Sequence, residues 1–255
     1  MSSKKKELSF SLSDLNILIL GAKLGIGASL ARICGEQNAN VILVDKEEPI
    51  ELADNLRQLA VANIVTYGCD ISNRDAVESL AAELSQRNYS PHSVALTAGI
   101  TFYNDWLETD NETWDRDVEQ IFNVNLAGPI NVARSFLPIM EKNNWGRMVL
   151  VGSIAGRMGG LTSQPHYAAS KGGVHSLTRW LASKYAPSGV LVNAVAPGPT
   201  KTRMTEGRSI DTSKLPLRRM LDPEDIAWPI AFLLSPAAAG MVGVVLDVNG
   251  GATFS

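Results

Sequence analysis

Residues 16–27 read NILILGAKLGIG, an apolar run that passes directly into a glycine-rich turn. The first five residues are typical of a strand buried on both faces of a sheet. Gly21, Gly25 and Gly27 then open a helical pattern over residues 27–37. Glycines at such a turn let the backbone approach a phosphate closely, and the helix N-terminus adds positive potential. The stretch predicts a strand–turn–helix unit that holds a dinucleotide, although glycines alone also mark ordinary turns.

The rest of the chain repeats this alternation of short strands and helices. Apolar runs typical of buried strands recur at residues 41–44, 64–67, 93–97, 147–151, 190–194 and 244–247. Helical patterns lie between them at residues 49–59, 74–86, 112–140, 167–185 and 223–234. Buried strands joined by helices predict an α/β fold, a Rossmann-like, doubly wound parallel sheet flanked by helices on both faces. We expect one domain over residues 15–255, with a tail at 1–14 and a substrate lid over about 197–221.

Composition and charge argue against several classes of function. The 255 residues carry a net charge of −3, which disfavours general nucleic-acid binding because such proteins are usually basic. No apolar stretch is long enough to span a bilayer and the N-terminus lacks a secretory signal, so we predict a cytoplasmic protein without membrane partners. Cys34 and Cys69 fit reduced thiols rather than a disulfide framework. The three histidines lack partners at ligand spacing, so no metal site is predicted.

Tyr167 and Lys171 are four residues apart in a helical pattern, which places both side chains on one face. A free tyrosine has a pKa near 10, and a neighbouring ammonium favours the phenolate and lowers that pKa. The pair therefore predicts a general acid or base. Ser153 follows the strand at 147–151, at the sheet edge where α/β proteins bind ligands. The alternatives are a turn serine and a surface pair, and for Asn125 in the helix at 112–140 a helix-bending polar residue.

Asp45 ends the second strand, twenty residues beyond Gly25. An acid at this point can accept hydrogen bonds from ribose hydroxyls, and it should repel the 2′-phosphate of NADP. NAD is therefore favoured over NADP, the alternative being that Lys23 or Lys46 pairs with that phosphate. Asp70 follows the third strand, where it could instead cap a loop. The Ala98–Gly99 pair after the fourth strand would let the backbone approach the cofactor closely.

With these motifs in this order, the chain from about residue 15 to its end resembles a classical short-chain dehydrogenase/reductase. The resemblance extends to Pro197-Gly198 with Thr202, and to the closing DVNGG at 247–251. The sequence departs from the family pattern at two positions. Leu20 stands where a threonine usually precedes the first glycine, and Thr97 replaces an asparagine that tethers strands at the centre of the sheet. A threonine can make only part of the asparagine's hydrogen bonds.

The resemblance implies a role for each matching residue. Tyr167 would exchange a proton with the substrate oxygen, and Lys171 would lower the tyrosine pKa and bind the nicotinamide ribose. Ser153 would hydrogen-bond the substrate oxygen, and Asn125 would support a water that links Lys171 to solvent. The cofactor would contact Gly21, Lys23, Leu24, Gly25, Ile26, Gly27, Asp45, Lys46, Asp70, Ile71, Ala98, Gly99, Tyr167, Lys171, Pro197, Gly198, Thr200 and Thr202.

The substrate pocket would be formed by residues after Ser153, residues before Tyr167 and the lid. The members we expect to contact substrate are Ile154, Arg157, Gln164, His166 and Met204, with Met158, Thr162 and Ile210 nearby. Basic residues outnumber acidic ones in the lid, which indicates either an anionic substrate or a solvated surface.

Together these features predict an NAD-dependent oxidoreductase that interconverts a secondary alcohol and a ketone. One alternative is an NADPH-dependent reductase of the 3-oxoacyl type, and another is an NAD-binding regulatory protein without turnover. The expected partner is a small-molecule alcohol or ketone. The resemblance also implies a homotetramer or homodimer, because in relatives the helices at 112–140 and 167–185 pair across a two-fold axis.

Overall fold

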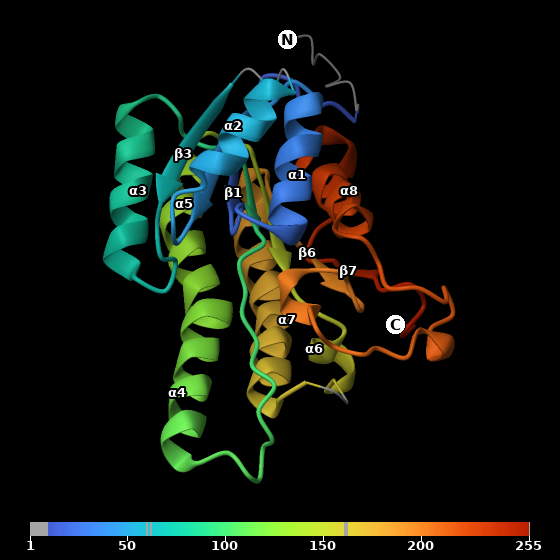
Figure 1. The fold of residues 1–255 in the computed structure, drawn as a ribbon. Helices are drawn as coiled ribbons and strands as arrows, with labels where there is room; N and C mark the ends of the chain where they lie inside the picture. The colour runs from blue at the N-terminus through green and yellow to red at the C-terminus, as the bar shows by residue number, and fades with distance from the viewer. Residues whose placement is uncertain (1–9, 60, 62, 161–162, 255) are drawn as a thin grey trace.

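The computed structural model describes residues 10–59, 61, 63–160 and 163–254 (Figure 1). Its strands are β1 (Asn16–Leu20), β2 (Asn40–Asp45), β3 (Ile64–Gly68), β4 (Ser93–Leu96), β5 (Gly146–Val151), β6 (Val190–Pro197) and β7 (Val245–Val248). Its α-helices are α1 (Gly25–Glu36), α2 (Ile50–Gln58), α3 (Arg74–Gln86), α4 (Asn111–Phe122), α5 (Gly128–Lys142), α6 (Ala155–Met158), α7 (Pro165–Tyr185) and α8 (Pro223–Leu234). One-turn 3-10 helices lie at Ala186–Ser188, Arg203–Thr205, Thr212–Lys214 and Pro236–Ala238. Each predicted strand is present, with ends shifted by at most a few residues.

All seven strands form one parallel sheet in the order β3-β2-β1-β4-β5-β6-β7. Leu20 at the end of β1 lies beside Val44 of β2 on one side and Leu96 of β4 on the other. The strand order reverses between β1 and β4, and such a switch point leaves a crevice at the carboxyl ends of the strands. The glycine turn and the segment after β4 both begin at this crevice.

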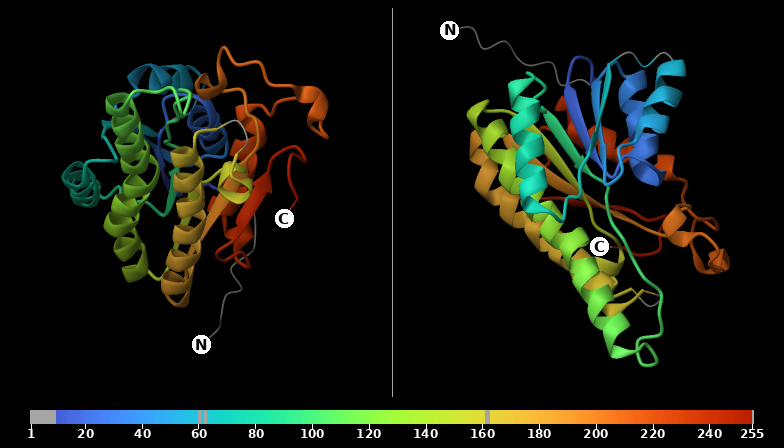
Figure 2. Two further views of the ribbon diagram at one scale, coloured as in Figure 1. Left: turned by 90° about the horizontal axis from the view of Figure 1, so that it is seen from below. Right: turned by 60° about the vertical axis from the view of Figure 1, so that its left-hand side comes forward.

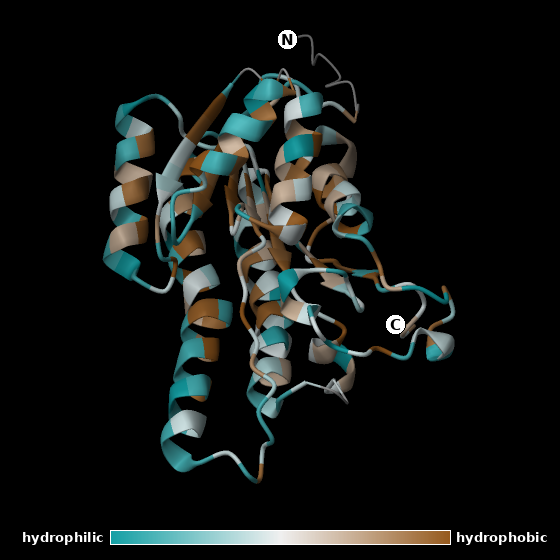
Figure 3. Ribbon diagram, viewed as in Figure 1, coloured by the Kyte–Doolittle hydropathy of each residue, from teal (hydrophilic) through white to brown (hydrophobic). Residues whose placement is uncertain are grey.

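Helices cover both faces of the sheet, as the two views in Figure 2 show. Leu18 and Leu20 of β1 point to the cluster that α3, α5 and α7 cover, whereas Ile17 and Ile19 point to the cluster under α1, α2 and α8. This alternation follows from the two-residue period of a strand. Figure 3 shows hydrophobic residues gathered on the strands and on the helix sides that face them. The predicted doubly wound fold is confirmed.

The ordered core begins earlier in the chain than the sequence indicated. Leu12 is fully buried among the residues of the cluster under α1, α2 and α8. The Phe10 ring lies 6.0 Å from the Trp228 ring of α8. The segment 10–14 is therefore not a tail, because its apolar side chains pack on the domain; residues 1–9 lie outside the described part.

The single helix expected over residues 112–140 is divided by a π-helical segment, Asn123–Ala127. The Gly128 N–H donates to the Asn123 carbonyl, the wider bond that defines such a turn. Pro129, which has no N–H to donate, follows at the start of α5. This widened turn holds Asn125, and π-bulges of this kind are frequent at functional sites.

The segment predicted to be a substrate lid, residues 197–221 and called the lid below, connects β6 to α8 and projects from the carboxyl edge of the sheet (Figure 1). Its base is closed by hydrogen bonds at 2.8 Å from the Lys201 N–H to the Leu221 carbonyl and from the Leu221 N–H to the Pro199 carbonyl. The two ends of the lid are therefore hydrogen-bonded to each other where they join the domain. Within the described residues, no helix has both the length and the apolar character required to cross a bilayer.

Candidate active site

Tyr167 and Lys171 lie one turn apart near the start of α7, which begins at Pro165. Lys171 is buried, with 4% of its surface exposed, and its Nζ donates to the Val151 carbonyl at 2.9 Å. The same Nζ lies 5.7 Å from the centroid of the Tyr167 ring. The carboxyl end of β5 thus holds the lysine ammonium beside the tyrosine.

Ser153 lies two residues after the end of β5 and is 9% exposed. Its Oγ accepts a hydrogen bond from the Ala155 N–H at 3.1 Å, at the start of the short helix α6, which the sequence had not indicated. The Ser153 side chain also lowers the pKa of Tyr167, so the two hydroxyl groups lie close together. The structure therefore brings Ser153, Tyr167 and Lys171 together at one strand end.

The protonation of this group differs from the sequence-based expectation. Burial raises the pKa of Tyr167 to about 12, against the lowering effect of Ser153. Burial also lowers the pKa of Lys171 to about 8. Lys171 was expected to lower the tyrosine pKa, but in this structure the loss of solvation is the largest effect on both groups.

Asn125 is fully enclosed, and its amide connects the segment after β4 to α7. Its Oδ1 accepts from the Ile100 N–H and its Nδ2 donates to the Ile100 carbonyl, each at 2.9 Å. Nδ2 also donates to the Ser170 hydroxyl at 3.2 Å. A Cβ on Gly99 would lie 3.3 Å from Lys171 Nζ and 3.4 Å from Asn125 Oδ1. Gly99 thus leaves room for the lysine, and the support of a water by Asn125 stays a prediction.

The glycine turn packs tightly against the end of β4. Gly21 has a φ of +87°, and a Cβ there would lie 2.3 Å from the Ala98 N atom. A Cβ on Gly27 would lie 2.0 Å from the Gly21 carbonyl oxygen. Thr97 Oγ1 lies 3.0 Å from the Leu20 carbonyl and 2.9 Å from the Gly21 carbonyl, to which it donates. Thr97 therefore provides the tether at this turn.

The start of α1 has the properties that a pyrophosphate requires. Its N-cap, Leu24, forms no side-chain cap, and no acidic residue lies in the first turn. The helices α3 and α4 have side-chain caps from Asn73 and Asp110, whereas α2, α5 and α7 lack one as α1 does. Leu24 is 51% exposed, so the first N–H groups of α1 are accessible at the crevice. The Gly21–Gly27 turn thus fits the phosphates of a dinucleotide.

Asp45 is held in place by two backbone N–H groups at the end of β2. Its Oδ2 accepts from the Lys23 N–H at 3.0 Å and its Oδ1 from the Lys46 N–H at 2.8 Å. The two lysine side chains point to other acids: Lys23 Nζ lies 2.5 Å from Glu47 and Lys46 Nζ lies 2.9 Å from Asp70. The carboxylate that should select the ribose is therefore fixed, and both nearby ammonium groups already have partners.

Asp70 and Ile71 occupy the loop after β3. Asp70 Oδ1 accepts from the Ser72 N–H at 3.0 Å and from its hydroxyl at 2.6 Å, the loop-capping role that the sequence left open. Ile71 is 5% exposed, and its side chain fills the space that a Cβ on Gly128 would need. Their predicted contact with an adenine stays a prediction.

The base of the lid lies next to the glycine turn. The Gly198 N–H donates to the Val248 carbonyl at 3.1 Å, so the closing DVNGG segment supports the lid from below. Thr200 is buried and its Oγ1 donates to the Gly198 carbonyl at 2.9 Å. A Cβ on Gly25 would lie 3.2 Å from Thr202 Cγ2. Thr202 and the turn thus face each other across the crevice.

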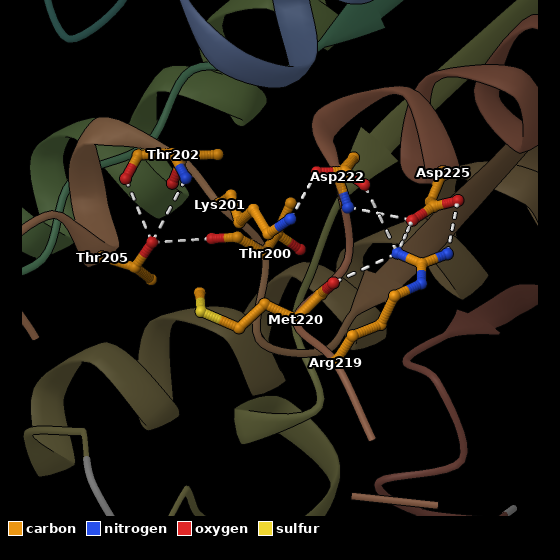
Figure 4. Close-up of polar contacts among 8 residues, drawn as sticks. All are labelled: Thr200, Lys201, Thr202, Thr205, Arg219, Met220, Asp222 and Asp225. Atoms are coloured by element: carbon orange, nitrogen blue, oxygen red, sulfur yellow. Dashed lines mark hydrogen bonds and ion pairs between the residues drawn. The ribbon is translucent and has the colours of Figure 1, made fainter. Parts of the chain in front are cut away.

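Two polar clusters fix this base, as Figure 4 shows. Thr205 Oγ1 lies 2.7 Å from the Thr200 carbonyl and 3.0 Å from the Thr202 carbonyl. In the second cluster, Arg219 pairs with Asp225 at 2.6 Å, and Lys201 pairs with Asp222 at 3.0 Å. These are the ends of the lid, so its two stems are anchored.

The five predicted substrate residues are not brought together as a group. Gln164 lines a cavity of about 540 Å³, whose other walls are Tyr103, Asn104, Asp105, Trp106, Gly159, Ser163, Pro165 and Arg208. Ile154 lies at the start of α6, where its N–H donates to the Pro197 carbonyl at 3.1 Å. Met204 lies in the first 3-10 turn of the lid. Thr162 lies outside the described residues.

Arg157 and His166 are placed differently from the sequence-based expectation. The Arg157 guanidinium pairs with Asp247 at 2.6 Å and donates to the Val245 carbonyl at 2.5 Å, so it joins α6 to β7. His166 is buried, and its ring lies 5.1 Å from the Trp114 ring. Neither residue is among those that line the cavity, and both ring nitrogens of His166 are buried without a hydrogen-bond partner in the described part of the chain. A contact of either residue with substrate stays a prediction.

The aromatic wall of the cavity was missed by sequence reasoning. Tyr103 and Trp106 belong to the segment after Gly99, whereas Arg208 comes from the lid. The signal that could have found them is the aromatic run Phe102–Trp106 directly after the fourth strand, where ligands bind in such sheets.

Comparisons with known proteins agree with this geometry. A family model described as enoyl-(acyl carrier protein) reductase matches residues 21–253. The chain is 34% identical over 249 residues to an acetoacetyl-CoA reductase of Synechocystis sp., covering 95% of this chain and 98% of that protein. It is 35% identical over 258 residues to a galactitol 2-dehydrogenase (L-tagatose-forming) of Cereibacter sphaeroides, covering 96% and 97%.

A solved structure also matches nearly the whole chain. It is a short-chain type dehydrogenase/reductase from Mycobacterium marinum, with a TM-score of 0.89 and 26% identity over 96% of this chain and 98% of that one. The fold, the ordered motifs and these similarities agree along the full described length. The chain therefore belongs to the short-chain dehydrogenase/reductase family of oxidoreductases.

Proposed function

We propose that this protein is an NAD(H)-dependent oxidoreductase that interconverts a secondary alcohol and a ketone. The observation that carries the proposal is the convergence of Ser153, Tyr167 and Lys171 beside the crevice at the switch point of the sheet. Ser153 lies near enough to Tyr167 to lower its pKa, and Lys171 Nζ lies 5.7 Å from the centroid of the tyrosine ring. When bound, the nicotinamide supplies or accepts the hydride.

Each side chain of the site would have its own role in the rest of the reaction. Ser153 would hydrogen-bond the substrate oxygen, and Tyr167 would donate a proton to it as the carbonyl is reduced. The pKa of Tyr167, raised by burial to about 12, keeps this phenol protonated at neutral pH, which suits donation. The buried ammonium of Lys171, fixed by Val151, would place positive charge where the phenolate develops.

The preference for NAD rests on Asp45. Two backbone N–H groups fix its carboxylate, and the 2′-phosphate of NADP would bring negative charge against it. Lys23 and Lys46 already pair with Glu47 and Asp70, which lessens their availability to a phosphate.

An NADPH-dependent 3-oxoacyl reductase is the second candidate. The similarity to an acetoacetyl-CoA reductase supports it. A third cation, Arg203 in the lid, also supports it. The charge of Arg203 lowers the pKa of both Lys23 and Glu47, so Arg203 lies near the ribose end of the crevice. Titration of the purified protein with NADH and with NADPH, followed by nicotinamide fluorescence, separates the two candidates. Tighter NADH binding supports the first, and tighter NADPH binding supports the second.

The proton-transfer step is tested with Tyr167→Phe on a panel of ketones. Turnover should fall by at least about 100-fold, because a positioned acid contributes about 10²–10⁴-fold. Binding of the cofactor should be unchanged. The matched control is Tyr185→Phe, at the far end of the same helix. Full activity of Tyr167→Phe would contradict the mechanism, and an absence of turnover in every form would favour a regulatory protein.

We also propose a homotetramer or homodimer in the cytoplasm. Ile130 on α5 and Trp180 on α7 are 45% and 60% exposed, which supports pairing of these helices between copies. The free, buried thiols of Cys34 and Cys69 support a reducing compartment. Light scattering of the wild type and of Trp180→Glu tests the assembly, because a charge at the interface should give monomers or smaller oligomers.

A further inference from the structure

The cavity beside the reaction site is lined by aromatic, polar and charged residues. Its Gln164 and Pro165 begin α7, two and three residues before Tyr167, and its Gly159 ends the short helix that follows Ser153. Its volume of about 540 Å³ is that of a small-molecule site. Ser153, Tyr167 and Lys171 are not among its lining residues, so the cavity adjoins the reaction site through the start of α7.

The basic residues of the lid differ in whether a carboxylate pairs with them. Three of its basic residues are neutralised: Lys201 by Asp222 at 3.0 Å, Lys214 by Asp211 at 3.6 Å, and Arg219 by Asp225 at 2.6 Å. The remaining three, Arg203, Arg208 and Arg218, have no carboxylate within 4.0 Å among the described residues. Of these, Arg208 alone is among the residues that line the cavity.

Arg208 is held at the cavity by an aromatic ring. The centre of its guanidinium lies 3.6 Å from the centroid of the Tyr103 ring. Stacking uses the face of the guanidinium and leaves its N–H donors at the edge available for a planar anion. Tyr103 in turn lies near enough to Tyr167 to raise its pKa. One tyrosine side chain therefore separates the free cation from the proton-transfer group.

The one carboxylate among the described lining residues, Asp105, forms no ion pair with Arg208 within 4.0 Å. Asp105 accepts from the N–H groups of Leu107 and Glu108 at 2.9 and 3.0 Å, so its carboxylate is engaged in its own loop. Asn104 donates to the buried Asp117 at 2.6 Å. Arg208 is thus an exposed cation without an ion-pair partner in the described chain, at the wall of an open cavity, and such a charge attracts an anionic ligand.

We propose that Arg208 binds an anionic group of the substrate, a carboxylate or a phosphate, and that this enzyme therefore acts on hydroxy or oxo compounds that carry such a group. This inference rests on the proposed oxidoreductase function and adds a residue that determines specificity. Arg208 acts on binding and takes no part in proton transfer.

The test compares charged probes with neutral probes of the same shape. Acetoacetate is paired with acetoacetamide, and dihydroxyacetone phosphate with dihydroxyacetone. The affinity of each is measured by calorimetry on the full-length protein with NAD⁺ or NADP⁺ present, and turnover is measured with NADH or NADPH. The first pair reports on a carboxylate and the second on a phosphate.

At least one charged probe should bind about tenfold tighter than its neutral partner, as expected for a charged hydrogen bond. Arg208→Gln should remove this difference, raising KM with little change in kcat, and Arg208→Lys should retain part of it. The matched control is Arg218→Gln, the same change at an unpaired lid arginine that does not line the cavity. Arg218→Gln should keep the full difference in affinity between charged and neutral probes.

Equal affinity for charged and neutral probes in the wild type would overturn the proposal. The same conclusion follows if Arg208→Gln weakens both kinds of probe equally, or if Arg218→Gln has as large an effect. If neutral ketones are turned over and Arg208 has no influence, this inference fails while the oxidoreductase function stands. If anions bind through Arg208 without turnover of any ketone, the site stands and the proposed reaction fails.

Discussion

The Thr97 hydroxyl donates to the Gly21 carbonyl at 2.9 Å, and this bond ties the end of β4 to the first residue of the glycine turn. The same hydroxyl lies 3.0 Å from the Leu20 carbonyl. A threonine thus holds the central strands at the position where the family usually has an asparagine. The Thr97 hydroxyl therefore stabilises the glycine turn rather than the substrate cavity.

Thr97→Val removes this hydroxyl while keeping the shape of the side chain. We expect the free energy of unfolding to fall by about 1–3 kcal/mol, because the Leu20 and Gly21 carbonyls lose a partner in a closed environment. The affinity for NADH should fall as the turn loosens. Urea denaturation and cofactor titration measure the two effects. Thr97→Ser, which keeps the hydroxyl, is the control, and equal behaviour of the two variants would contradict the role of the bond.

Asp45→Ser should change the choice of cofactor. Removal of the fixed carboxylate takes away a hydrogen-bond acceptor for the ribose and the repulsion of a 2′-phosphate. We expect the ratio of NADPH to NADH affinity to rise by roughly tenfold or more, the value of a charged hydrogen bond. Fluorescence titration of both cofactors measures the ratio. Asp54→Asn, which changes a surface acid on α2, should leave it unaltered. An unchanged ratio in Asp45→Ser would remove Asp45 as the selector.

Arg157→Met should affect stability rather than substrate binding. Its guanidinium and the Asp247 carboxylate are 21% and 17% exposed, so the loss of one partner leaves the other charge poorly solvated. We expect a loss of about 1–3 kcal/mol in the free energy of unfolding, with KM unchanged. A double-mutant cycle with Asp247→Asn should show that the two residues are coupled. Independent effects would contradict the coupling of Arg157 to Asp247, and a selective rise in KM would support the predicted contact of Arg157 with substrate.

Lys171 should make stability depend on pH in the alkaline range. Its pKa is about 8 in the folded protein and near 10.5 when exposed, so between these values the unfolded state binds more protons. Stability therefore rises with pH in this window. From pH 7.5 to 9.0 the wild type should gain about 1 kcal/mol relative to Lys171→Met. Urea denaturation of both proteins at both pH values measures this, since their other titrating groups are shared. A difference that does not vary with pH would contradict the low pKa.

The sequence by itself determined the sheet, the helices on both faces and the order of the motifs. Local apolar periodicity and glycine placement are enough for this, because each strand and each turn depends on neighbouring residues. Leu18 and Ile19 alternate between two cores as their spacing requires. The spacing of Tyr167 and Lys171 likewise placed both on one face of a helix, whereas their approach to Ser153 depends on the packing of α7 against β5.

Only the tertiary structure decided which charges are paired and which line the cavity. Arg157, Arg208 and Arg219 look alike in the sequence, yet one joins α6 to β7, one stacks on Tyr103 and one anchors the lid. Their partners lie at very different distances along the chain: 6 residues for Arg219, 90 for Arg157 and 105 for Arg208. The pKa of Tyr167 was also decided by burial, because desolvation depends on the whole surrounding structure and not on the residue four positions away.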